Sequence, residues 1–173
     1  MKRGTQRFNL IMALLLLPLL GCQSTSPDGE KAKDASYLRL HLETFPDGTH
    51  RTQVVPVYRA SPVEICIFTQ PFLSEVDIDR AWVVDEPGSF AIRIQFEEKH
   101  GARVLDMTTT AYKGQRVAIY ADFGQARWLA APVITRRVSD GMLTFTPDAT
   151  REEADRIVSG LNRVADKLRK KRQ

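Results

Sequence analysis

The chain has 173 residues, of which 43% are hydrophobic and 27% charged, a composition typical of one globular domain rather than of a disordered chain. Its formal net charge of +4 comes from the two ends, because three basic residues lie in the first seven positions and five in the last seven. The chain between them is net acidic, so composition gives no support for a nucleic-acid-binding surface, and no nucleic-acid partner is expected.

Residues 1–21 have the features of a cleaved bacterial export signal. Basic residues precede the apolar stretch 10–20, which is shorter than the roughly 20 residues of a membrane-spanning helix. The stretch ends in Leu19-Leu20-Gly21-Cys22, which resembles the lipobox of bacterial lipoproteins, where the cysteine thiol receives diacylglycerol. We therefore expect Cys22 to be lipidated and the chain to be held at a membrane by its acyl chains. An ordinary signal peptide followed by a chance cysteine is the alternative.

The residues after the cysteine predict where the protein sits. In lipoproteins of this kind an aspartate after the cysteine favours the inner membrane, so Gln23 favours the outer membrane, with the chain facing the periplasm. Residues 22–36 are rich in Ser, Asp and Lys and cannot bury a core. We interpret them as a lipidated flexible tether.

Residues 37–70 are predicted to form an N-terminal β segment. Leu38, Leu40 and Leu42 alternate with polar residues, as in a half-buried strand. The turn residues 46–49 predict a hairpin that returns through 53–58, and a further strand is expected over 63–69. Cys66 lies in that last strand and is expected to be a buried structural thiol, without a disulfide partner if Cys22 is acylated.

The next elements alternate between strand and helix patterns. Ser74 and Asp77 are spaced as a cap that opens a short helix reaching Asp79. An extended segment over 81–84 and a clearly alternating strand over 90–96 follow. A helix is predicted over 98–113, with Gly114 as its C-terminal stop.

The remaining elements complete an α+β fold. Residues 116–122 are apolar on both faces and predict a central strand, and 127–133 and 142–146 complete the sheet. Thr150 and Glu153 form a capping box that opens a last helix, whose apolar stripe reaches Leu168. The expected architecture is a mostly antiparallel sheet with two main helices on one face, followed by a basic tail at 169–173.

Several motifs between Pro71 and Asp166 resemble the first periplasmic domain of SecD, a membrane subunit of the bacterial protein-export machinery. The motifs keep the family's order and are Pro71 to Ala81, Ser89 to Phe96, Gly101 to Arg103, Gly114 to Asp122, Leu129 to Ile134 and the helix after Thr150. They are similar to the family's "PLLTgaDIkdA", "grpaVsFtl", "GAr…vGkrLAIvlD", "iSAPvI" and "eeA..La..L". The resemblance implies a SecD-like domain over 71–168.

The resemblance also implies what this chain lacks. Family members carry several transmembrane helices and are thought to use the proton gradient to move this domain against an emerging polypeptide. No such helices or intramembrane carboxylate are visible here, so we expect no proton-driven work. The family's glycine-rich "GxaqItG" hairpin is reduced to Gly141-Met142-Leu143-Thr144-Phe145, which puts any family role of that hairpin in doubt.

The candidate chemical residues predict no enzyme. His41 and Glu43 could begin a metal site, but no third ligand has suitable spacing, so a solvated strand face is expected. His50 and His100 are expected to be exposed, and Asp77 and Asp79 to belong to a capped helix. No nucleophile, phosphate-binding or dinucleotide motif occurs. No catalytic residue, cofactor or metal is therefore predicted, and packing is the expected role of the two tryptophans, Trp82 and Trp128.

These observations favour a lipid-anchored, non-enzymatic envelope protein with a SecD-like periplasmic domain that binds a protein or peptide. An exposed sheet edge, or a groove beside the last helix, would take an extended segment by strand addition. The alternative is a structural or assembly lipoprotein with one fixed partner. An envelope enzyme is a third class, which a histidine meeting a carboxylate in a deep pocket would revive.

Overall fold

A computed structural model describes residues 35–172. The expected export signal 1–21, Cys22 and most of the expected tether 22–36 lie outside the described residues. The elements in chain order are β1 (Tyr37–Leu42), β2 (Thr52–Val57), β3 (Val63–Phe68), β4 (Leu73–Ser74), the 3-10 helix η1 (Glu75–Asp77), β5 (Ile78–Glu86), β6 (Ser89–Phe96), α2 (Gly101–Ala111), β7 (Val117–Asp122), β8 (Ala126–Ala130), β9 (Met142–Phe145) and α3 (Arg151–Arg172). The α+β class predicted from the sequence is confirmed.

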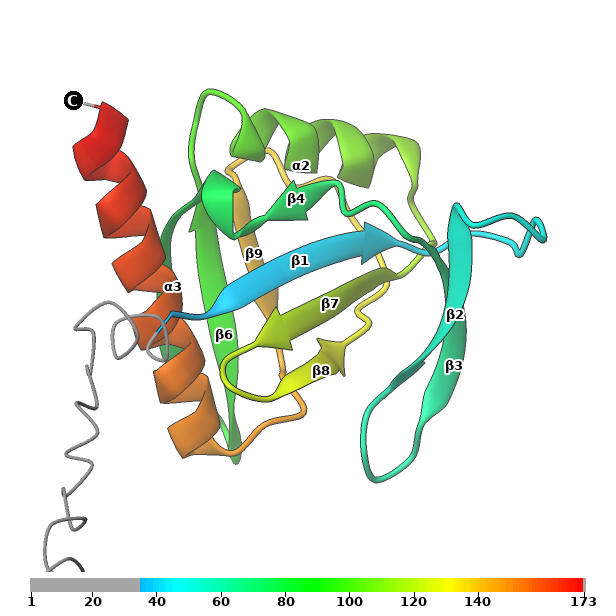
Figure 1. Cartoon of the computed structure of the whole chain (residues 1–173), viewed down its shortest axis with the longest axis horizontal. Coiled ribbons are helices and arrows are strands. Elements are labelled where there is room, and N and C mark those ends of the chain that lie inside the picture. Colours follow the sequence, from blue (N-terminus) through cyan, green and yellow to red (C-terminus); the bar gives the residue numbers. More distant parts are fainter. Residues whose placement is uncertain (1–34, 173) are drawn as a thin grey trace, which may run out of the picture.

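The strands form three antiparallel sheets rather than the single sheet expected. The first has the order β4-β1-β7-β8, and the second is the β2-β3 hairpin. The third has the order β5-β6-β9. Figure 1 shows α3 beside the third sheet and the β2-β3 hairpin at the opposite end of the molecule.

The main core lies between the first sheet, the third sheet and the two helices. Strand alternation turns Leu38 and Leu40 of β1 toward it, and both are fully buried. Leu105 of α2 and the stripe Ile157 and Leu161 of α3 are fully buried in the same cluster. The predicted amphipathic face of the last helix is therefore confirmed.

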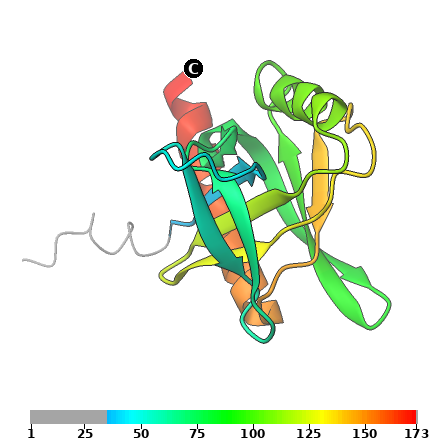
Figure 2. The same ribbon diagram turned by 90° about the vertical axis from the view of Figure 1, so that its right-hand side faces the viewer.

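A second, smaller core explains why β2 and β3 form a separate layer. Val55, Val57, Ile65 and Ile67 are buried on the inner face of the hairpin, against Ala118 of β7. Figure 2 shows the hairpin in front of the first sheet, with α3 behind it. The first sheet is thus covered on both faces, which is why β7 is apolar on both sides.

The predicted pairing of the first two strands is wrong. β1 pairs with β7 over its whole length, from Tyr37 opposite Asp122 to Leu42 opposite Val117, and not with β2. β2 instead pairs with β3, with Val54 opposite Cys66. The strand positions were visible in the local alternation, but the choice of partner depends on the long-range cores just described.

Helix ends differ from the prediction by a few residues, for local reasons. The Ser74 cap is present, since its N–H donates to Asp77 Oδ2 at 2.9 Å, but the helix ends at Asp77 because Ile78 enters β5. α2 begins at Gly101 and not at 98, because the Glu97 carboxylate accepts the backbone N–H of Gly101 at 3.1 Å. The Thr150 and Glu153 capping box is confirmed, with both bonds formed at 2.8 and 3.2 Å.

Candidate functional site

The residues singled out in the sequence do not assemble into a reaction centre. Among residues 35–172 there is no group of three or more His, Cys, Asp or Glu placed to hold a metal ion. Within the described residues, one histidine contacts a carboxylate: His100 Nδ1 lies 3.0 Å from Asp77 Oδ1, and this pair is at the surface. His50 is exposed, as predicted.

His41 is buried, which makes the predicted solvated face wrong. The β2-β3 hairpin covers this side of β1, and the His41 Nδ1–H donates to the Phe68 carbonyl oxygen at 2.9 Å. Its ring also meets Trp128 edge-on, with centroids 5.2 Å apart. Burial lowers the pKa of His41, so the ring is held neutral. His41 therefore fastens the hairpin to the first sheet.

Cys66 and the tryptophans also differ in part from expectation. Cys66 is a free thiol and only half-buried, because strand alternation sends its neighbours Ile65 and Ile67 inward and turns Cys66 to the outer face of the hairpin. Trp128 is half-buried, as predicted. Trp82 is 40% exposed on β5.

The predicted binding mode directs attention to the sheet edges, and several of them are closed. On β5, Asn162 of α3 occupies both backbone groups of Ala81, with bonds of 2.8 and 2.9 Å. On β8, Asp148 N–H donates to the Leu129 carbonyl oxygen at 2.7 Å. The predicted groove beside the last helix is therefore absent at the β5 edge, because α3 itself covers that edge.

Two further edges are poor templates for another strand. β4 has only two residues. On β2, Thr69 N–H donates to the Arg51 carbonyl, so every second residue from Arg51 onward bonds to β3 and the residues between them direct their backbone groups outward. Pro56 is one of the outward residues. A proline there removes the N–H that an added strand would need.

The outer edge of β9 offers unpaired backbone groups. Phe96 N–H donates to the Gly141 carbonyl at 2.9 Å, so Leu143 and Phe145 direct their backbone groups toward β6. The backbone groups of Met142 and Thr144 then point away from the sheet. Asp140 Oδ1 accepts the Met142 N–H at 3.0 Å, and the Thr144 N–H has no hydrogen-bond partner among residues 35–172.

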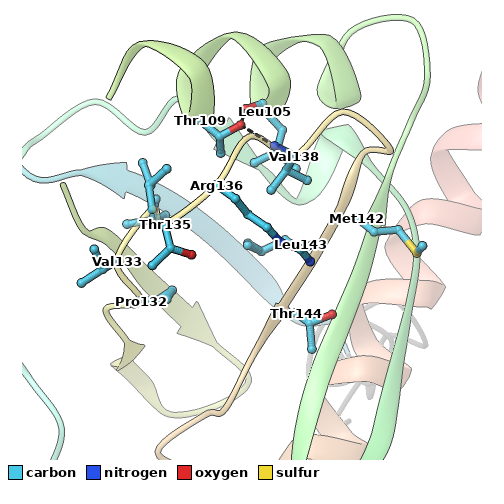
Figure 3. Close-up of a pocket in the computed structure, with 12 residues that line it drawn as sticks. Leu105, Thr109, Pro132, Val133, Thr135, Arg136, Val138, Met142, Leu143 and Thr144 are labelled. Carbon is cyan, nitrogen blue, oxygen red and sulfur yellow. Dashed lines mark hydrogen bonds between the residues drawn. The ribbon is translucent and has the colours of Figure 1, made fainter. Parts of the chain in front are cut away.

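A groove runs beside this edge (Figure 3). Its cavity has a volume of about 170 Å³ and lies between β9 and the segment Pro132–Val138, with Leu105 and Thr109 of α2 as its floor. Met142 and Val133, on opposite sides, are 39% and 47% exposed. The groove thus combines an unpaired strand edge with apolar contact surface, which is what binding of an extended segment requires.

The far wall of the groove, the segment Pro132–Val138, is held in place at both ends. Ile134 N–H donates to the Gln115 carbonyl at 2.8 Å, and Val138 N–H donates to Thr109 Oγ1 at 2.9 Å. Between them Arg137 forms a forked pair with Asp106, including an Nη2–Oδ2 bond of 2.6 Å that lowers the pKa of the Asp106 carboxyl. The wall of the groove is therefore held by hydrogen bonds to α2 and to the segment that precedes β7.

A second apolar groove lies at the other end of the first sheet, between the hairpin and α2. Phe68, Phe72 and Tyr112 line a cavity of about 360 Å³, with Leu42 among the other lining residues. The outer face of the hairpin next to it exposes Val54 at 56% and Phe68 at 40%.

Sequence reasoning predicted an exposed edge but not which one. The turn at Asp140-Gly141 and the short following strand were visible, but the segment Pro132–Val138 carries no local pattern that marks it as a wall. Its place depends on α2 and β7, which are distant in sequence. The signal that could have been used is the brevity of β9, since a short strand after a long irregular connection is typical of an edge.

Known structures share this fold. No family model matches the chain, and no curated protein matches it in sequence. A solved structure of SecDF, described as a membrane component that enhances protein export, is similar with a TM-score of 0.55 and 18% identity over 84% of this chain and 70% of that one. The super-membrane-facing form of SecDF is similar with the same TM-score and identity over 80% of this chain, which spans 21% of that protein's length.

These likenesses confirm the resemblance to a SecD periplasmic domain as a resemblance of fold. The structural match covers more of the chain than the motifs between Pro71 and Asp166 suggested. Among the helices of the described part of the chain, none is both long and apolar enough to cross a bilayer.

Proposed function

We propose that this chain is a lipid-anchored envelope protein whose SecD-like domain binds extended protein segments and is not an enzyme. The observation that carries the proposal is the unpaired outer edge of β9 beside an apolar groove. A segment would pair with the backbone of Thr144 and place its side chains between β9 and the Pro132–Val138 wall. The similarity to SecDF, which enhances protein export, supports an accessory role in handling exported chains.

The position on the membrane follows from the N-terminal sequence. Lipidation of Cys22 would hold the domain at a bilayer, and Gln23 favours the outer membrane facing the periplasm. The test is a Cys22→Ser variant compared with the unchanged chain by detergent partition and by labelling with a fatty-acid analogue. We expect the Cys22→Ser variant to lose both the fatty-acid label and its partition into the detergent phase. Full membrane retention of the unlabelled variant would contradict the anchor.

The binding mode is tested by removing one backbone donor. Thr144→Pro deletes the outward N–H without touching the β6–β9 hydrogen bonds, whereas Thr144→Ser keeps both the N–H and the hydroxyl that accepts from Arg93 Nε. A photo-crosslinking amino acid at Met142, in cells, should capture periplasmic polypeptides in the Ser variant and lose them in the Pro variant. Equal capture by two equally stable variants would contradict strand addition at β9.

A second candidate function is a structural or assembly lipoprotein. The observation that favours it is the apolar patch formed by Val54, Phe68 and the groove with Tyr112, which suits one fixed partner. Crosslinking from Val54 discriminates the two functions. One partner at constant stoichiometry would favour assembly, and many unfolded chains captured from Met142 would favour the first proposal.

A further inference from the structure

The groove beside β9 has one charged residue in its lining, Arg136. Figure 3 shows its side chain reaching from the Pro132–Val138 wall toward Leu143 on β9. The neighbouring Arg137 is paired with Asp106, whereas Arg136 forms no hydrogen bond or ion pair with any of residues 35–172. An unpaired guanidinium therefore lies across the route of any segment that pairs with the edge.

The surroundings of Arg136 favour an anion. Arg93 on the adjacent strand donates its Nε–H to Thr144 Oγ1 at 3.3 Å, so a second cation lies next to the edge. Two acids lie near the groove: Asp106 of α2 is held by Arg137, and Asp140 accepts the Met142 N–H at the start of β9. Arg136 itself is exposed, so a carboxylate of a bound segment would reach its planar fork at the open side of the groove, next to the apolar side chains.

We infer that this groove selects extended segments that carry an acidic side chain, and that Arg136 is the residue that pairs with it. The inference rests on the proposed function, since it specifies the substrate class of the same site. An uncharged apolar segment would displace the Arg136 guanidinium and offer it no hydrogen-bond partner. A basic segment would be repelled by the guanidinium.

The test uses nine-residue peptides of alternating Val and Thr, acetylated and amidated at their ends, with Glu, Gln or Lys at the centre. Binding to the full chain in detergent is followed by fluorescence anisotropy. We expect the Glu peptide to bind about tenfold more tightly than the Lys peptide, as for one charge-assisted hydrogen bond. Arg136→Gln should abolish the difference and Arg136→Glu should reverse it.

The controls separate this inference from the function on which it rests. Arg156→Glu makes the same charge change on the exposed face of α3 and should keep the preference for Glu. Equal affinity for the three peptides, or a preference unchanged in Arg136→Glu, overturns the inference and leaves strand addition standing. Binding of no peptide overturns both. A fourth peptide, the Gln sequence with a free C-terminal carboxylate, is added for comparison, and tighter binding of this peptide than of the amidated Glu peptide overturns the assignment to an acidic side chain.

Discussion

The side-chain amide of Asn162 in α3 bonds both backbone groups of Ala81 in β5, donating to its carbonyl oxygen at 2.9 Å and accepting its N–H at 2.8 Å. The Asn162 side chain thus satisfies the backbone groups of Ala81 that would otherwise be open to a further strand at the β5 edge of the third sheet. These two bonds also hold α3 against β5, and the preceding residue of the helix, Leu161, is fully buried. This contact leaves β9 as the accessible edge of that sheet.

Asn162→Ala should destabilise the fold by about 1–3 kcal/mol, because it leaves a partly buried N–H and carbonyl without partners. Urea denaturation followed by circular dichroism measures the change. Arg156→Ala, at an exposed position of the same helix, is the control and should shift stability by less than about 0.5 kcal/mol. If the two variants were equally stable, the amide would not be closing the edge.

Gly160→Ala should be destabilising, although the same change in an open helix stabilises by about 0.5–1 kcal/mol. A Cβ at Gly160 would lie 2.1 Å from Ser36 Oγ and 2.6 Å from the Ser36 backbone nitrogen. We expect a loss of about 1–3 kcal/mol, as in overpacked cores. Combining it with Ser36→Gly, which removes the nearest atom, should recover part of that loss in a double-mutant cycle. A stabilised single variant would show that the chain before β1 does not pack on α3.

Docking of the β2-β3 hairpin should weaken in mild acid. Burial lowers the pKa of His41 below its ordinary value of 6.5, so the unfolded state binds a proton more readily than the folded one. The stability from neutral His41 is therefore complete above pH 6.5 and is lost as the pH falls through the folded pKa. A Trp82→Phe background makes Trp128, whose ring contacts His41, the only tryptophan reporter of this region.

The comparison that isolates His41 is His41→Asn, which offers an N–H to the Phe68 carbonyl but does not titrate in this range. Urea midpoints at pH 7.5, 6.5 and 5.5 should fall for the parent and stay level for the variant, apart from effects shared by both. Parallel slopes would mean that His41 does not carry the dependence.

The local periodicity of the sequence predicted individual elements well. Alternation identified β1 and β6, and the Thr150 cap with its apolar stripe identified α3, because these patterns follow from the geometry of each element. Pairing could not be predicted in the same way. His41 lies at an outward position of β1, and only the docking of a hairpin from residues 52–68 makes it buried.

The same reason limits prediction of the site. Element patterns and the motif resemblance predicted the fold, and the expectation of an open sheet edge came from the lack of reaction motifs in the sequence. The groove, however, is assembled from Thr109, Arg136 and Thr144, which lie on α2, the irregular wall and β9. In the sequence, Arg136 and Arg137 are two adjacent arginines that nothing distinguishes. The ion pair between Arg137 and Asp106 separates their roles only in the folded chain.

Glu153 should give a second, more acidic transition in stability. Its carboxylate accepts from Arg127 Nη2 at 2.5 Å, and that hydrogen bond, opposed by burial and helped by the Thr150 N–H, lowers the pKa of Glu153 below its ordinary value of 4.5. The stabilisation is therefore present above pH 4.5 and is lost as the pH falls through the folded pKa.

Glu153→Gln keeps an acceptor for the Thr150 N–H but removes the charge beside Arg127, whose side chain is 14% exposed and whose Nε has no hydrogen-bond partner. We expect a loss of about 1–3 kcal/mol at pH 7, the range for a hydrogen bond to a charged group. At pH 3 the parent carboxyl is increasingly protonated, so the gap between the two chains should narrow. Thermal unfolding of both chains at the two pH values measures it, and a gap of equal size at both would show that the Arg127–Glu153 ion pair does not stabilise the start of α3.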